Sequence, residues 1–131
     1  MNDKPLFILG ALMLSLSLSG QAHAADALQD RYVQIAELEI DPTQLDRYKA
    51  AVEEQIEAAI RLEPGVLVLY AVSEKENPAR IWVLEVYAST DAYNAHLQAE
   101  HFRKYKRTTD AMVKSLKLVR VDPLLLGAKA R

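Results

Sequence analysis

The sequence predicts a small α+β domain in which four strands and two helical regions follow one another in the order βαββαβ. Three observations predict this order. Apolar and polar residues alternate over 31–40, as in a strand with one buried face. Apolar residues then recur three and four positions apart over 45–60, as in an amphipathic helix. Two apolar runs joined by a short turn follow, which favours a β-hairpin.

The first strand is expected over 31–40, and a helix should begin directly after it. Asp41 is a suitable N-cap, and Pro42 suits the first helical position because its missing N–H costs nothing there. The apolar face of this helix is predicted to consist of Leu45, Tyr48, Val52, Ile56, Ala59 and Ile60.

Glu63-Pro64-Gly65 is expected to end that helix. The runs 66–73 and 80–88 then read as two strands rich in β-branched and aromatic residues, with the turn Glu76-Asn77-Pro78-Ala79 between them.

The second helical region should start at Ser89 or Thr90, either of which can act as the N-cap. A break is expected around 99–101, because the apolar spacing resumes in a new phase and continues to Leu116. A last strand is predicted over 116–121. The order of elements is that of a ferredoxin-like fold, in which one four-stranded antiparallel sheet carries both helices on one face.

Residues 1–24 are typical of a secretory signal peptide, with Lys4 near the start, an apolar run over 6–18 and Ala22-His23-Ala24 before the cleavage point. A retained membrane anchor is the alternative, but the apolar run is shorter than the roughly 20 residues that cross a bilayer. We therefore expect one domain over 25–131 in a periplasmic or secreted protein, with no membrane contact after cleavage.

The composition excludes several partners and chemistries. The net charge is −2 and basic residues are scattered among acidic ones, which disfavours a nucleic-acid partner. There is no cysteine, so thiolate catalysis, haem attachment through cysteine and cysteine-rich zinc sites are excluded.

The second and third strands are apolar on both sides, although two helices can cover only one face of the sheet. A large uncovered apolar face is rare on a soluble monomer. We therefore expect a homodimer joined sheet to sheet. The tail Leu124-Leu125-Leu126 either reaches onto the partner or folds back on its own chain.

The most distinctive stretch runs through Trp82-x-x-Glu85-x-Tyr87, Ala95-His96-Leu97 and His101-Phe102-x-x-Tyr105. Together with Glu63-Pro64-Gly65 upstream, this pattern resembles the antibiotic biosynthesis monooxygenase (ABM) family, which includes quinol monooxygenases. The resemblance covers 32–123. It implies a dimeric α+β barrel of ferredoxin-like subunits and the oxidation of a phenolic or quinol substrate by dioxygen without a cofactor.

His96 is the candidate catalytic base, because a histidine pKa lies near the working pH. The alternative is a histidine that only hydrogen-bonds within the core. Glu85 is expected to have a partner such as Arg80, Arg120 or a histidine, because an unpaired buried carboxylate is costly. His101 can line a pocket or cap the second helical segment. The candidate substrate-binding residues are Tyr70, Trp82, Glu85, Tyr93, His101 and Phe102.

A metal site is disfavoured on the sequence alone. His96 and His101 are not one helical turn apart, and no third ligand is evident. Haem binding through one histidine stays open. Oxidation of a small aromatic molecule is therefore the first hypothesis for function, and a non-catalytic dimer that binds a small molecule or responds to stress is the alternative.

Overall fold

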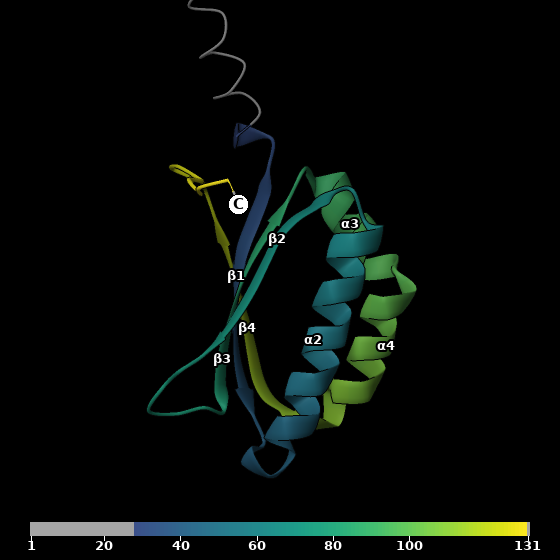
Figure 1. Ribbon diagram of the computed structural model, residues 1–131, viewed down its shortest axis with the longest axis vertical. Helices are drawn as coiled ribbons and strands as arrows, with labels where there is room; N and C mark the ends of the chain where they lie inside the picture. The colour runs from purple at the N-terminus through teal and green to yellow at the C-terminus, as the bar shows by residue number, and fades with distance from the viewer. Residues whose placement is uncertain (1–27, 131) are drawn as a thin grey trace, which may run out of the picture.

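The structure is a computed structural model that describes residues 28–130 (Figure 1). The predicted signal peptide lies outside the described residues. The first half consists of β1 (Tyr32–Ile40), the short 3-10 helix η1 (Pro42–Gln44), α2 (Leu45–Leu62) and β2 (Val66–Ser73). The second half consists of β3 (Arg80–Tyr87), α3 (Thr90–Gln98), α4 (Glu100–Thr109), the 3-10 helix η2 (Asp110–Met112) and β4 (Val113–Val121).

The four strands form one antiparallel sheet in the order β2-β3-β1-β4. Helices α2, α3 and α4 lie on the same side of this sheet, and none of the three covers its other face (Figure 1). The predicted ferredoxin-like α+β fold is confirmed. Within 28–130, no helix is both long and apolar enough to span a bilayer.

Local capping explains where the helical regions begin. The Asp41 carboxylate accepts a hydrogen bond from the Thr43 backbone N–H at 2.9 Å, and Ser89 Oγ accepts one from Ala92 N–H at 3.1 Å. Each side chain satisfies a donor that the first turn of a helix leaves free. Both predicted N-caps are confirmed, with Ser89 rather than Thr90 in the second position.

The predicted start of the last strand is wrong. The helix ends at Thr109, and β4 begins at Val113, which pairs with Ile40 of β1. The Asp41 N–H also donates to the Met112 carbonyl at 2.8 Å, so a contact with the end of β1 draws this segment into the sheet. Such a long-range pairing overrides the helical spacing that the sequence shows at 112–116.

Gly65 allows close contact between the start of β2 and α3. A Cβ atom at this position would lie 2.6 Å from Ala92 Cβ, which is too close for two carbon atoms. Any larger residue would push α3 away from the sheet, so this glycine helps to set the position of the helix that carries His96.

The register of the sheet determines which residues face the helices. On β1 they include Gln34 and Ala36. Their partners on β3, Glu85 and Val83, face the same way. The outer face includes Tyr70 and Val72, whose partners on β3 are Leu84 and Trp82; Tyr70 is 61% and Val72 58% exposed. In the tail, Leu124 and Leu125 are also exposed.

Candidate functional site

A cavity of about 290 Å³ lies between the helix-facing side of the sheet and the helices. Its wall is mainly apolar, with contributions from Ala36, Leu38, Val52, Ile56, Leu69, Val83, Leu97, Phe102, Val113, Leu116 and Leu118. The polar and aromatic side chains in the wall are Gln34, Gln55, Glu85, Tyr87, Tyr93, His96, Tyr105, Lys106 and Thr109.

Glu85 places a carboxylate in this apolar wall. Gln34 Nε2 donates a hydrogen bond to Glu85 Oε2, and the Tyr87 hydroxyl donates to Oε1 at 3.1 Å. Burial raises the pKa of the Glu85 carboxyl above its usual value, and the two hydrogen bonds and nearby His96 oppose that rise. The sequence suggested an arginine or a histidine as its partner, whereas its hydrogen-bond donors are two neutral side chains.

Three tyrosines pack together beside this polar network: Tyr87 and Tyr93 line the cavity, and Tyr32 contacts both of their rings. The Tyr32 hydroxyl donates to Gln34 Oε1 at 3.1 Å, and the Tyr32 ring stacks on Tyr93 with ring centroids 4.0 Å apart. The guanidinium of Arg120 covers the Tyr32 ring at 3.4 Å, a cation–π contact. Burial raises the pKa of the Tyr32 and Tyr87 hydroxyls, so they remain protonated hydrogen-bond donors.

His96 is 1% exposed and brings its ring to the cavity wall from α3. Its Nδ1 lies 2.7 Å from Glu63 Oε2, and its Nε2 lies 3.1 Å from Gln55 Nε2. Both ring nitrogens therefore have a polar neighbour. The other amide atom, Gln55 Oε1, is buried and has no hydrogen-bond partner among the described residues.

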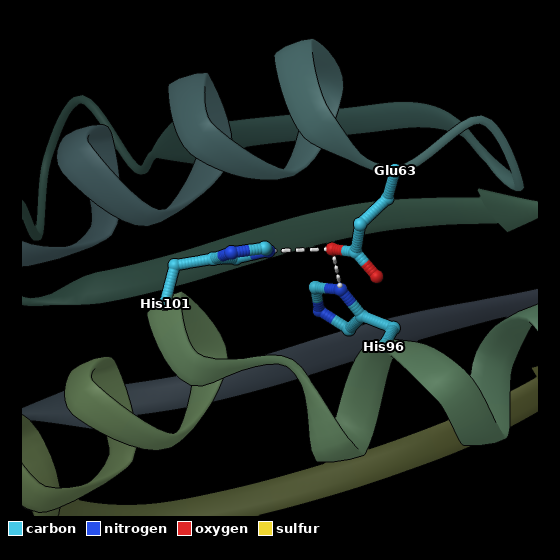
Figure 2. Close-up of side chains that lie close together, drawn as sticks. All are labelled: Glu63, His96 and His101. Carbon is cyan, nitrogen blue, oxygen red and sulfur yellow. Dashed lines mark hydrogen bonds and ion pairs between the residues drawn. The ribbon is translucent and has the colours of Figure 1, made fainter.

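Glu63 also contacts His101, as Figure 2 shows. His101 Nε2 lies 2.6 Å from the same oxygen, Glu63 Oε2. The two histidines come together because Ala99 is extended, with ψ 139°, between α3 and α4. In one continuous helix, residues five positions apart would point about 140° away from each other.

These contacts remove both grounds on which the sequence disfavoured a metal. The break at Ala99 makes the histidine spacing along the chain irrelevant, and Glu63 is a third side chain of a type that can ligate a metal. The donor atoms of Glu63, His96 and His101 all lie within 4.8 Å of one another.

The structure places the candidate site residues in three different locations. His96, Glu85, Tyr93 and Phe102 line the cavity. Tyr70 and Trp82 lie on the outer face of the sheet, and Trp82 Nε1 donates to Glu74 at 3.2 Å. His101 lies beside Glu63 and is not part of the cavity wall.

Sequence reasoning missed several polar residues of the site, among them Gln34, Gln55 and Glu63. Gln34 and Gln55 carry a recognisable signal, since each is a polar residue at an otherwise apolar position of its element. Gln55 is buried on the inner face of α2, whereas Ile60, which was assigned to that face, is half exposed. Glu63 carries no such signal, because its partners are 33 and 38 residues further along the chain.

A family model described as antibiotic biosynthesis monooxygenase matches residues 31–108. A solved structure named as a candidate antibiotic biosynthesis monooxygenase, from Bacteroides thetaiotaomicron, is 45% identical with a TM-score of 0.76, over 79% of this chain and 99% of that one. A candidate monooxygenase from Lactobacillus acidophilus is 26% identical with a TM-score of 0.68, over 70% of this chain and 45% of that one.

A third structure, a candidate antibiotic biosynthesis monooxygenase from Caulobacter crescentus, has a TM-score of 0.70 over 79% of this chain and 99% of that one. At 21% identity, this likeness shows the fold alone. No functionally curated protein matches the chain.

Proposed function

Because the chain belongs to the antibiotic biosynthesis monooxygenase family, we propose that it oxidises a phenolic or quinol-type compound with dioxygen in the cavity between sheet and helices. The cavity volume of about 290 Å³ lies at the lower end of the range for small-molecule sites, which starts at roughly 300 Å³. This size favours a compact aromatic compound of one to three fused rings. The apolar wall suits the ring faces of such a compound.

The position of Glu85 carries the proposal. A phenol gives an electron to dioxygen far more readily as its anion, so the site needs a proton acceptor in a dry environment. Glu85 is a carboxylate in the cavity wall, and burial raises its pKa toward the working range of a general base. Hydrogen bonds from Gln34 and Tyr87 hold it in place and leave further lone pairs for a substrate hydroxyl.

His96 is the base that the sequence suggests, but its surroundings favour another role. One ring nitrogen faces Glu63 and the other faces Gln55, so a substrate would have to displace a partner to reach either. We therefore assign proton acceptance to Glu85, and we assign to His96 the shaping of the wall beside Phe102, whose ring centroid is 4.8 Å away.

The proposed reaction starts when Glu85 takes the proton of a substrate hydroxyl. The anion then supplies electrons to dioxygen. For an anthrone-type substrate the overall change is from CH2 to C=O, and the second oxygen atom leaves as water with the two hydrogens of that carbon. Glu85 then returns its proton to the hydroxyl oxygen of the product, which restores the carboxylate.

Oxygen uptake with a panel of quinols and anthrone-type phenols tests this function. The wild-type protein should consume oxygen faster than buffer, and Glu85→Gln should lose that gain. Glu76→Gln, a change of an exposed carboxylate in the β2–β3 turn, is the matched control and should keep it. Absence of a gain across the panel would favour binding without catalysis.

A haem titration without a Soret shift would exclude the haem-binding alternative.

We also propose that the outer face of the sheet packs against a second copy of the chain. The exposure of Tyr70 and Val72 on this face supports the proposal. In such a dimer, Tyr70 and Trp82 would belong to the interface and not to the cavity.

A further inference from the structure

We propose that Glu63, His96 and His101 form a binding site for a divalent transition-metal ion. The site goes beyond the proposed oxidation, which uses Glu85. Its ligands would be Glu63 Oε2, His96 Nδ1 and His101 Nε2, which all lie within 4.8 Å of one another (Figure 2). Three different parts of the fold contribute them: the C-terminal end of α2, α3 and α4.

The donor set selects the class of ion. Two imidazole nitrogens and one carboxylate oxygen suit Zn²⁺, Co²⁺, Ni²⁺ or Fe²⁺, whereas Mg²⁺ and Ca²⁺ prefer oxygen ligands only. Two histidines and a glutamate are also a known protein ligand set for zinc that leaves a position for water.

The present distances are those of hydrogen bonds, and an ion would require only a small change. The two nitrogens lie 2.7 and 2.6 Å from the carboxylate oxygen. With metal–ligand bonds of about 2.0–2.2 Å in a tetrahedral arrangement, neighbouring donors lie roughly 3.3 Å apart. Each nitrogen–carboxylate separation would grow by roughly 0.6 Å, and the two nitrogens, which lie within 4.8 Å of each other, would approach by at most roughly 1.5 Å.

Glu63 and His101 are partly exposed, so their side chains can make the movement that an ion requires. The Glu63 and His101 side chains are 15% and 17% exposed, so both can adjust and the ion can enter from solvent. His96 is almost fully buried and would act as the fixed inner ligand. An ion held in this way would tie the end of α2 to the break between α3 and α4.

Gln55 provides the support that a metal-bound histidine needs. Ligation through His96 Nδ1 leaves the proton on Nε2, and such histidines ordinarily donate that proton to a nearby acceptor. The Gln55 amide lies 3.1 Å from Nε2. After a half-turn of this amide its oxygen, which has no partner among residues 28–130, would accept the proton.

The ion would lie outside the cavity, on the far side of the His96 ring. Glu63 and His101 are not part of the cavity wall, whereas His96 is. Metal binding would therefore fix the orientation and tautomer of one wall residue without contacting a bound substrate. Failure of this proposal would leave the assignment of Glu85 untouched.

Metal titration of the untagged full chain, purified with a chelator and then dialysed, tests the site. Calorimetry with Zn²⁺ measures affinity and stoichiometry, and the visible absorption of bound Co²⁺ reports nitrogen and oxygen ligands. The site variants are Glu63→Gln, which keeps the size of the side chain, and His101→Ala, at a partly exposed position. Glu76→Gln and Thr108→Ala change exposed residues outside the ligand set and are the matched controls.

We expect one Zn²⁺ per chain, a Co²⁺ absorption band and an increase in thermal stability, because the ion binds only the folded state. Each site variant should weaken Zn²⁺ binding at least about tenfold, or about 1.4 kcal/mol. The control variants should bind Zn²⁺ as tightly as wild type. Mg²⁺ should neither bind at this site nor raise the thermal stability. Absence of wild-type binding at millimolar Zn²⁺, or unchanged affinity in both folded site variants, would identify the three residues as a hydrogen-bonded cluster only.

Discussion

Gln34 on β1 and Glu85 on β3 are direct partners in the antiparallel register, and the Gln34 amide donates a hydrogen bond to the Glu85 carboxylate on the cavity side of the sheet. This pair defines the polar centre of an otherwise apolar wall. Because the hydrogen bond favours the charged form of the carboxylate, it limits the rise in the Glu85 pKa that burial causes.

Substitution Gln34→Leu should therefore raise the pKa of Glu85 further. A hydrogen bond to a charged group contributes about 1.5–3 kcal/mol, and 1.36 kcal/mol corresponds to one pKa unit, so we expect a rise of about one unit or more. Carbon NMR of the side-chain carboxyl as a function of pH measures it directly. Gln98→Leu, at an exposed position on α3, should leave the Glu85 titration unchanged.

The raised pKa of Glu85 also predicts how stability depends on pH. The folded state holds the Glu85 proton more tightly than the unfolded state, whose value is near 4.5. The contribution of this group to the free energy of unfolding is therefore largest below pH 4.5, and it falls as the pH rises toward the folded-state pKa.

Glu85→Gln removes this contribution and should flatten that part of the pH dependence. Urea denaturation of both proteins between about pH 4 and pH 8 measures it. The variant should gain stability relative to wild type as the pH rises. A constant difference over the whole range would show that Glu85 titrates alike in both states.

Gly65→Ala should destabilise the protein, because the new methyl group would lie 2.6 Å from Ala92 Cβ. Overpacking of this kind costs about 1–3 kcal/mol. The double variant Gly65→Ala/Ala92→Gly should recover part of that loss, since it removes the atom in the way. Gly127→Ala, where a Cβ would meet nothing within 4 Å, should not change the melting temperature.

Charge on the outer face of the sheet should prevent the proposed dimer from forming. Sedimentation at micromolar concentration should give twice the chain mass for wild type and the monomer mass for Tyr70→Glu or Val72→Asp, because a buried unpaired charge is costly. Ile60→Glu, at a half-exposed position on α2, is the matched control and should remain dimeric. A monomeric wild type would contradict the dimer.

The features that the sequence predicted best depend on neighbouring residues. The caps at Asp41 and Ser89 and the break near Ala99 follow from a few adjacent positions, and all three are present. The start of β4 was misplaced because its pairing with Ile40 lies far away in the chain.

The candidate site was harder to predict because its contacts also join residues that are far apart in the chain. Strand alternation places Glu85 and Trp82 on opposite faces of β3. By residue type alone, both side chains are candidates for the lining of a pocket that binds an aromatic compound. The contact of Glu63 with two histidines depends on how α2 packs against α3 and α4, which no local pattern encodes.

Oxygen uptake by wild type and Glu85→Gln, measured side by side with a one- or two-ring quinol, tests the central proposal most directly. We predict a clear rate gain over buffer for wild type, a gain that rises with pH as the carboxyl loses its proton, and loss of this gain in Glu85→Gln. Equal rates for wild type and the folded variant would contradict the proposed role of Glu85, and a wild-type rate equal to that of buffer would contradict the proposed oxidation.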